Sequence, residues 1–146
     1  MNRGYNMDEI ETKAFMGSGL SFPLRVNAHT GRFVTCDHED NIHESIKLIL
    51  QTFRGERVMR PEFGAVADNV QFSDLSAEII AGMEEDIRYT LETEEPRIIN
   101  VSAKALRENM GYLNVEVSYR VTATNNQFNR VYPFYILEGA GMSAAD

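Results

Sequence analysis

Residues 112–121 read Tyr-Leu-Asn-Val-Glu-Val-Ser-Tyr-Arg-Val, and this stretch decides the fold class. Apolar or aromatic side chains occupy every second position, at Leu113, Val115, Val117, Tyr119 and Val121. Polar side chains fill the positions between them. Successive side chains of a strand point to opposite faces, so this alternation predicts a strand with one buried and one solvated face.

Two further strands flank this segment. Upstream, alternate apolar residues run from Ile99 to Ala105, and Asn109-Met110-Gly111 predicts a turn. Downstream, Asn125-Asn126 predicts a second turn, and residues 131–137 predict a third strand. Pro133 cannot donate a ladder hydrogen bond, which places that strand at an edge or a bulge. Short turns between the strands predict a three-stranded antiparallel meander.

Two helices are predicted before the meander. The first follows Asn41 as the N-cap with Glu44 three residues on, and Gly55 ends it. The second covers residues 75–93, with Ser73 or Ser76 as the cap, and Pro96 ends it. Their apolar residues recur at helical spacing. The stripe of the first is Ile42, Ile46, Ile49, Leu50 and Phe53, and that of the second is Ile79, Ile80, Met83, Ile87 and Leu91.

Upstream of the helices, residues 22–26 and 32–36 predict a β-hairpin around a turn-rich linker. The fold class is therefore α+β: a hairpin, two helices, then a meander packed on the helices. We expect a mobile N-terminal arm at residues 1–18, one domain at residues 19–138 and a flexible tail at residues 139–146. The length of 146 residues suits a single domain.

Composition excludes several classes of function. The net charge is −8, from 14 basic and 22 acidic residues, which argues against nucleic acid as a partner. No apolar run is long enough to insert in a membrane. Acidic residues concentrate in residues 76–95, which predicts a solvated helix face or a surface that steers a basic partner. These are Glu78, Glu84, Glu85, Asp86, Glu92, Glu94 and Glu95, against Arg88 alone.

Sites for metals, cofactors and nucleophilic catalysis are not predicted. The three histidines lack an HExxH pattern, and Cys36 is the single cysteine, interpreted as a small buried hydrophobe. One enzymatic hypothesis remains, which is catalysis by a pair of carboxylates. The candidates are Glu56, Glu62 and Glu95. Acidic residues are so abundant that three such candidates are expected by chance.

Three arginines lie next to acidic residues in irregular segments. These are Arg57, Arg60 and Arg97, near Glu56, Glu62 and Glu95. Arginine and carboxylate form planar two-point pairs, which hold a loop in shape or bind another protein. Both readings stay open from the sequence.

Four segments together are specific to one family. They are Gly19-x-x-Phe22-Pro23-Leu24, a helix segment at residues 42–52, the stretch GERxMRPEFG at residues 55–64, and Glu95-Pro96-Arg97. The sequence resembles the baseplate wedge and sheath-initiator family of contractile tails, which includes type VI secretion (TssE-like) subunits and extracellular contractile injection systems. The family has also carried a lysozyme-like label. The resemblance spans residues 19–137 and does not reach residues 1–18.

The resemblance implies a structural, non-enzymatic protein without a cofactor, assembled in the bacterial cytoplasm into the baseplate of a phage tail or tail-like particle, in six copies. Glu95, Pro96 and Arg97 would contact the wedge core, with Arg57, Arg60 and Glu62 shaping or gripping the adjoining loop. The last strand would template the first sheath ring by strand augmentation, through Val131, Tyr132, Phe134, Tyr135 and Ile136.

The partners implied are other wedge subunits, the sheath protein, and inner tube or hub proteins. The resemblance also implies that Arg97→Ala leaves the monomer folded but keeps it out of the baseplate. Two alternatives stay open: a peptidoglycan-cleaving enzyme of lysozyme type, and a regulatory protein-binding module on the same fold.

Overall fold

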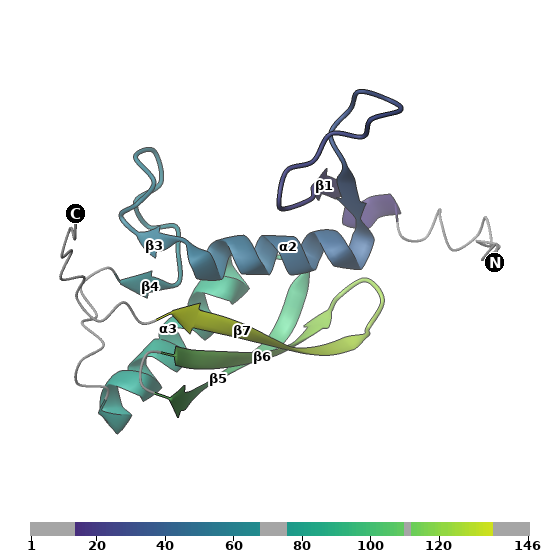
Figure 1. Ribbon diagram of the computed structural model, residues 1–146. Coiled ribbons are helices and arrows are strands. Elements are labelled where there is room, and N and C mark those ends of the chain that lie inside the picture. The colour runs from purple at the N-terminus through teal and green to yellow at the C-terminus, as the bar shows by residue number, and fades with distance from the viewer. Residues whose placement is uncertain (1–13, 68–75, 110–111, 136–146) are drawn as a thin grey trace, which may run out of the picture.

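The computed structural model describes residues 14–67, 76–109 and 112–135. The part of the chain after α3 is the predicted meander (Figure 1). The strands are β5 (Ile98–Asn109), β6 (Tyr112–Val121) and β7 (Gln127–Tyr135), paired antiparallel in the order β5-β6-β7. The α+β fold class is confirmed.

Strand β6 supplies one wall of the core, as its alternation predicts. Its five apolar residues are each at most 1% exposed, while the residues between them are half-buried. β7 begins four residues earlier than predicted, because the alternation already starts at Phe128, which pairs with Tyr119. Residues 136 and 137 of the predicted strand lie outside the described residues. Pro133 lies on an edge strand, as predicted.

Helix α2 (His38–Gln51) covers the sheet face, and its stripe of Ile42, Ile46, Ile49 and Leu50 is buried. Three predictions for it were wrong, the first being its end at Gly55, because α2 ends at Gln51 with Thr52 as its C-cap. The N-cap is Asp37, and Asn41 lies inside the helix. Phe53 belongs to β3 and is 43% exposed, because the helix ends before the stripe reaches it.

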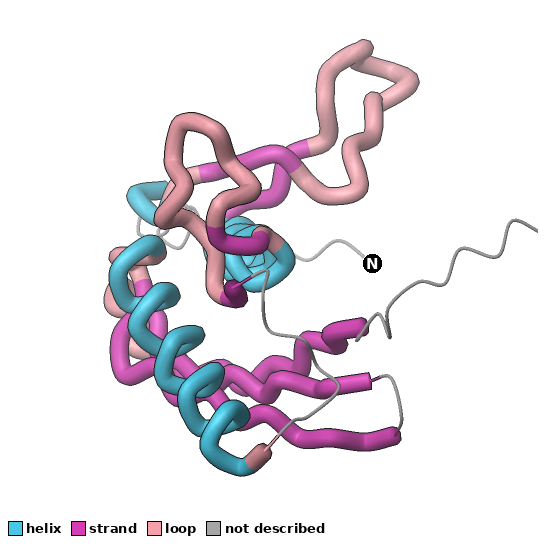
Figure 2. Tube along the Cα trace, turned by 90° about the vertical axis from the view of Figure 1, so that its left-hand side faces the viewer, coloured by secondary structure: helices cyan, strands magenta, loops and turns pink. Residues whose placement is uncertain are grey.

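Helix α3 (Ala77–Glu94) lies beside β5 (Figure 2). Ser76 caps it, accepting a hydrogen bond of 3.3 Å from the N–H of Ile79. Met83, Ile87 and Leu91 join the core, with Ile80 packed against it. Ile79 was wrongly assigned to the stripe, since it is 41% exposed in the first turn. The cap Ser73 and the start at Leu75 lie outside the described residues.

The hairpin forms with a register different from the predicted one. β1 (Ser18–Leu20) pairs with β2 (Thr35–Asp37), and of the predicted strand 22–26 only Val26 is paired, by a single bridge to Phe33. Pro23 lacks an N–H and interrupts that strand. Gly19 allows the new register, because a Cβ there would meet Asn41 Oδ1 at 2.3 Å.

Three smaller features were not predicted. β3 (Phe53–Arg54) pairs in parallel with β4 (Val66–Ala67). The 3-10 turn η1 (Ala14–Met16) lies within the predicted N-terminal arm, and the Met16 side chain is 2% exposed in the core. Residues 1–13 of that arm and the predicted tail at 139–146 lie outside the described residues.

Cys36 is half-buried, so its interpretation as a buried core residue was wrong. It lies on strand β2 of the hairpin, beside the start of α2, outside the hydrophobic core. Its Sγ is 3.7 Å from the carbonyl oxygen of Leu20 and 3.8 Å from that of Gly19. Partial burial, followed by the negative charge of Glu44, raises the pKa of this thiol, which keeps it protonated and unreactive at neutral pH.

Candidate functional site

The C-terminal end of α3 holds an ion pair between two of the predicted site residues. Arg97 Nε lies 2.6 Å from Glu95 Oε1, and Arg97 Nη2 donates to the other carboxylate oxygen. Glu95 is 2% exposed, while the Arg97 side chain is 29% exposed. The structure thus brings Glu95 and Arg97 together as a two-point pair whose carboxylate is buried.

Glu95 stays ionised despite this burial. Burial by itself would raise the pKa of Glu95, but hydrogen bonds from Arg97 and from Ser45 of α2 outweigh it and hold the pKa below its ordinary value. The carboxylate therefore links the end of α3, the start of β5 and the middle of α2.

Arg97 also ties down the N-terminal turn. Its Nη1 donates a 2.8 Å hydrogen bond to the carbonyl oxygen of Met16. Phe15, Pro96 and Arg97 line a surface depression of about 230 Å³ beside this contact, and Phe15 is 66% exposed. The Glu95-Pro96-Arg97 segment therefore presents its proline and part of its arginine to solvent while its glutamate is inside.

The preceding residue, Glu94, fixes the irregular loop of residues 55–64. Arg60 Nη2 lies 2.9 Å and 3.2 Å from the two carboxylate oxygens of Glu94, and Arg60 Nε lies 3.3 Å from Glu62. The guanidinium of Arg57 stacks 4.0 Å above the ring of Phe63, with Arg60 5.5 Å from the same ring. Arg57 is thus held by an aromatic ring and not by a carboxylate.

These contacts hold the loop of residues 55–64 in shape, but the side chains at its tip remain exposed to solvent. Val58 is 94% exposed and Met59 is 92% exposed, the highest values among the exposed large apolar residues of the described chain. At the base, Glu56 accepts a 3.0 Å hydrogen bond from the N–H of Phe53. Gly64 permits close packing there, because a Cβ would lie 2.4 Å from the carbonyl oxygen of Thr52.

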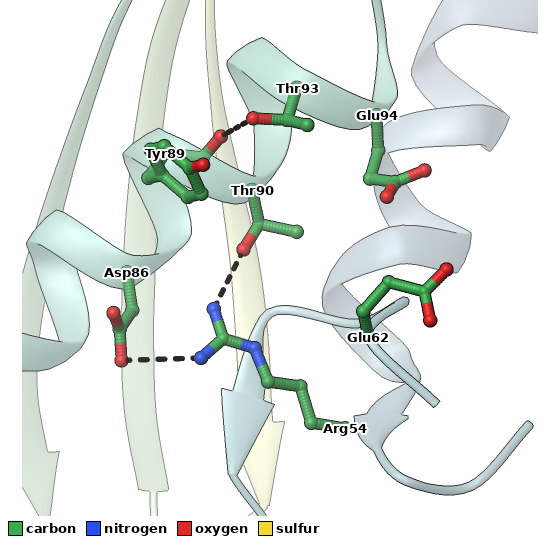
Figure 3. Close-up of a pocket in the computed structure, with 7 residues that line it drawn as sticks. All are labelled: Arg54, Glu62, Asp86, Tyr89, Thr90, Thr93 and Glu94. Carbon is green, nitrogen blue, oxygen red and sulfur yellow. Dashed lines mark hydrogen bonds and ion pairs between the residues drawn. The ribbon is translucent and has the colours of Figure 1, made fainter. Parts of the chain in front are cut away.

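A groove of about 440 Å³ separates α3 from the start of this loop (Figure 3). Arg54 reaches across it, donating to Thr90 Oγ1 at 3.1 Å and to the carbonyl oxygen of Gly64 at 3.3 Å. Its Nη1 lies 3.9 Å from Asp86. Figure 3 shows Tyr89 on the α3 side of the groove and Glu62 on the loop side.

Sequence reasoning missed Arg54, Asp86, Thr90 and Glu94 as parts of this site. A signal did exist for three of them. Asp86, Thr90 and Glu94 are spaced by four along α3, so they lie on one helix flank. Arg54 carried no such signal, because its role depends on the unpredicted β3–β4 pair.

The predicted sheath-binding residues divide between the two faces of β7. Tyr132 and Phe134 pair with Val115 and Leu113 and pack against the core. Val131 pairs with Glu116 on the other face and is 58% exposed. The side chain of Tyr135 and the whole of Ile136 lie outside what the structure describes.

The two edges of the sheet differ. On β5, the main-chain N–H of Ala105 donates a 2.7 Å hydrogen bond to Glu84 Oε1 of α3, so a helix side chain occupies that edge. Within the described residues, β7 pairs only with β6. Its outer edge therefore presents main-chain groups that another strand can pair with.

The three carboxylates considered for catalysis lie in separate environments. Glu56 caps a loop N–H, Glu62 pairs with Arg60, and Glu95 pairs with Arg97. The pKa of Glu62 is lowered, first by a main-chain hydrogen bond and then by Arg60, and that of Glu95 is lowered as well. A glycosidase acid needs a raised pKa, which neither group has.

Two further observations concern other classes of site. The described residues contain no cluster of three or more histidine, cysteine or acidic side chains arranged to hold a metal ion. In the same part of the chain, neither helix combines the length and the apolar character needed to cross a membrane.

Comparison with solved structures finds three related folds. A protein of Geobacter sulfurreducens, whose crystal structure carries the provisional label of a tail lysozyme, is 40% identical, with a TM-score of 0.66 over 75% of this chain and 100% of that one. A chain of the anti-feeding prophage baseplate is 18% identical, with a TM-score of 0.60 over 86% of this chain and 90% of that one. A chain of the type VI secretion baseplate complex is 13% identical, with a TM-score of 0.56 over 65% and 90%.

A search of curated proteins finds no significant match. The family profile described as baseplate wedge protein gp25 matches residues 36–126, which include α2, α3, β5, β6 and the four arginines of the site, Arg54, Arg57, Arg60 and Arg97. On this match over more than half of its length, the chain belongs to the baseplate wedge protein family.

Proposed function

We propose that this protein is a non-enzymatic baseplate subunit that joins the wedge core through the end of α3 and starts the contractile sheath through β7. The observation that carries the sheath role is the difference between the two sheet edges. Glu84 occupies the β5 edge at Ala105, whereas the outer edge of β7 has no partner strand within the described residues and can accept one. Val131 adds an exposed apolar side chain beside that edge.

The wedge contact would use the surface around the two ion pairs at the end of α3. Glu95 and Arg60 are bound internally, so they hold the surface in shape. Pro96, Arg57 and the free part of Arg97 are the groups available to a partner, with Glu62 at the rim. Ordered side chains lose little entropy on binding, which favours association.

The proposal includes six copies per particle, assembly in the bacterial cytoplasm, and partners among wedge subunits, the sheath protein, and inner tube or hub proteins. Family membership and the likeness to two baseplate chains support it.

Val131→Lys tests the sheath role. A lysine on an exposed edge strand disfavours pairing with a second strand, while Glu116 opposite it keeps the fold stable. We expect particles with complete baseplates but few or no assembled sheaths by negative-stain microscopy. Leu106→Lys, on the other edge strand, 55% exposed and opposite the neutral Asn114, is the matched control and should assemble normally. Normal sheaths on Val131→Lys particles would refute the edge-strand role.

Arg57→Glu tests the wedge role. Arg60 and Glu94 still brace the loop in this variant, so the monomer should stay folded and unfold only slightly below the wild-type temperature, since the stacking of Arg57 on Phe63 is lost. We expect the purified baseplate to contain much less of this variant than of Arg107→Glu, an exposed arginine on β5. Equal incorporation of both variants would exclude Arg57 from the interface.

A peptidoglycan-cleaving function is the second candidate, because the Geobacter relative carries the lysozyme label. The purified protein and its Glu62→Gln and Glu95→Gln variants should be compared for clearing of a peptidoglycan suspension. We expect no clearing by any of them. Clearing by the wild type, lost in one variant, would establish catalysis instead.

A further inference from the structure

The hairpin of residues 17–37 stands apart from the core and carries apolar side chains that the described chain does not bury. It projects beyond the start of α2, on the side of that helix opposite the three-stranded sheet, in both views (Figures 1 and 2). Every residue from Phe22 to Thr35 is exposed. Six of the fifteen exposed large apolar residues of the described chain lie in this hairpin. They are Leu20, Phe22, Leu24, Val26, Phe33 and Val34.

The charge of the hairpin is opposite to that of the rest of the protein. Residues 17–37 contain Arg25 and Arg32 against a single acidic residue, Asp37 at the base, so they carry +1 in a chain of net charge −8. The remainder therefore carries −8 − 1 = −9. Both arginines are exposed, and neither forms an ion pair within the described residues.

The backbone of the hairpin is ordered by its own hydrogen bonds. Val34 N donates to Arg25 O and Asn27 N donates to Arg32 O, each at 2.8 Å. At the tip, Gly31 N donates to Asn27 O at 2.8 Å, and the Asn27 side chain accepts from His29 N at 2.9 Å. The apolar side chains are thus presented on a preformed scaffold, which lowers the entropy cost of docking.

We propose that this hairpin is a third docking surface, in addition to β7 and the end of α3, for a neighbouring baseplate subunit whose surface presents apolar side chains bordered by carboxylates. The exposed apolar residues supply the buried centre of such an interface, and Arg25 and Arg32 supply its charged rim. Two arginines among apolar residues are too few for nucleic acid, and the net charge of −8 repels an anionic membrane.

The hairpin and β7 lie on opposite sides of α2, so both can be occupied at once. With the wedge contact at the end of α3, one chain would then join three neighbours, and α2 would separate the hairpin contact from the β7 contact. The inference rests on membership of the baseplate family and does not depend on sheath templating by β7.

Photo-crosslinking in assembled particles identifies the neighbour. A photoreactive phenylalanine analogue at Leu24 or at Phe33 should form crosslinks to one other baseplate subunit, in a peptide with acidic residues next to apolar ones. The same analogue at Ile79, an exposed apolar residue of α3, is the matched control. Crosslinks no stronger than this control, or to a second copy of this chain, lipid, nucleic acid or a basic segment, would overturn the proposal.

Charge reversal tests the rim independently. The double variant Arg25→Glu with Arg32→Glu should lower incorporation into baseplates about tenfold, because like charges across an interface are repelled. It should leave the thermal unfolding temperature unchanged, since both side chains are exposed and unpaired in the described chain. Wild-type incorporation of this variant would overturn the proposal. Sheath assembly on those particles that do contain the double variant measures the role of β7 separately from that of the hairpin.

Discussion

Glu84 accepts a hydrogen bond of 2.7 Å from the main-chain N–H of Ala105, and this one contact makes the two edges of the sheet unequal. An unpaired row of main-chain groups at a sheet edge invites association with another strand. Helix α3 removes that risk on β5, while β7 stays open in the described chain. The β7 edge is therefore the one at which the proposed sheath contact would add a strand.

We expect Glu84→Ala to destabilise the protein and to open the second edge. The Ala105 N–H would lose its acceptor, at a cost of about 1–3 kcal/mol. Urea unfolding measures this cost, and light scattering follows self-association. Glu85→Ala, which removes only an exposed pair with Arg88, should change stability far less. Equal effects of the two variants would show that Glu84 does not protect the edge.

Arg97→Ala should destabilise the monomer, contrary to the expectation from the family resemblance that it leaves the fold intact. Removal of the guanidinium leaves Glu95 unpaired at 2% exposure, at a cost of about 3 kcal/mol. A double-mutant cycle with Glu95→Gln should give a coupling energy of about 2 kcal/mol from urea unfolding. The cycle between Arg88 and Glu92, an exposed pair, should give under about 0.5 kcal/mol.

Because Arg97→Ala is expected to destabilise the monomer, its absence from baseplates would reflect both partial unfolding of the monomer and the loss of a contact with the partner. Pro96→Ala is the cleaner variant for the contact, because Pro96 is exposed outside the ion pair.

Stability should fall between neutral and mildly acidic pH because of His43. Burial first, then the charge of Arg130, lowers the pKa of His43 below 6.5, against the opposing effects of Asp40 and Glu39. Its ring packs edge-on against Phe128 at 5.1 Å and Tyr119 at 6.0 Å. The folded state therefore binds a proton at His43 less readily than the unfolded state does. The stability that this difference contributes is fully present above pH 6.5 and is lost as the pH falls through the pKa of His43 in the folded state.

Urea unfolding at pH 7.5 and at pH 5.5 measures this loss. His43→Phe keeps an aromatic ring in contact with Phe128 but cannot titrate, so its stability should change less over the same interval. The carboxylates titrate mainly below this interval and are shared by both proteins. An identical pH dependence in both would assign the loss to other groups.

Arg60→Ala should loosen the loop at residues 55–64 without unfolding the domain. It removes the two hydrogen bonds from Nη2 to Glu94 and one of the two cations beside Phe63. We expect faster hydrogen exchange in the peptide that spans Gly55 to Gly64 and unchanged exchange in β6. Arg60→Lys should restore only part of the protection, because one ammonium can replace Nη2 at Glu94 but has no second nitrogen to replace Nε at Glu62. Exchange like that of the wild type would show that Phe63 packing alone holds the loop.

The sequence by itself determined the meander, the two helix stripes and the family. These follow from local periodicity: alternation along residues 113–121, and helical spacing from Ile42 to Leu50 and from Met83 to Leu91. Adjacent acidic and basic residues also indicated the Glu95–Arg97 and Arg60–Glu62 pairs. Such signals depend only on neighbours in the chain, so they can be read without the fold.

Tertiary structure alone decided the hairpin register, the pairing of Arg60 with Glu94, the role of Arg54 and the difference between the two sheet edges. Each depends on residues distant in the chain. Gly19 must lie against Asn41 for the hairpin to pair as it does, and Glu84 must reach Ala105 to close an edge. Long-range contacts of this kind follow from how helices pack on the sheet, and no local pattern encodes that packing.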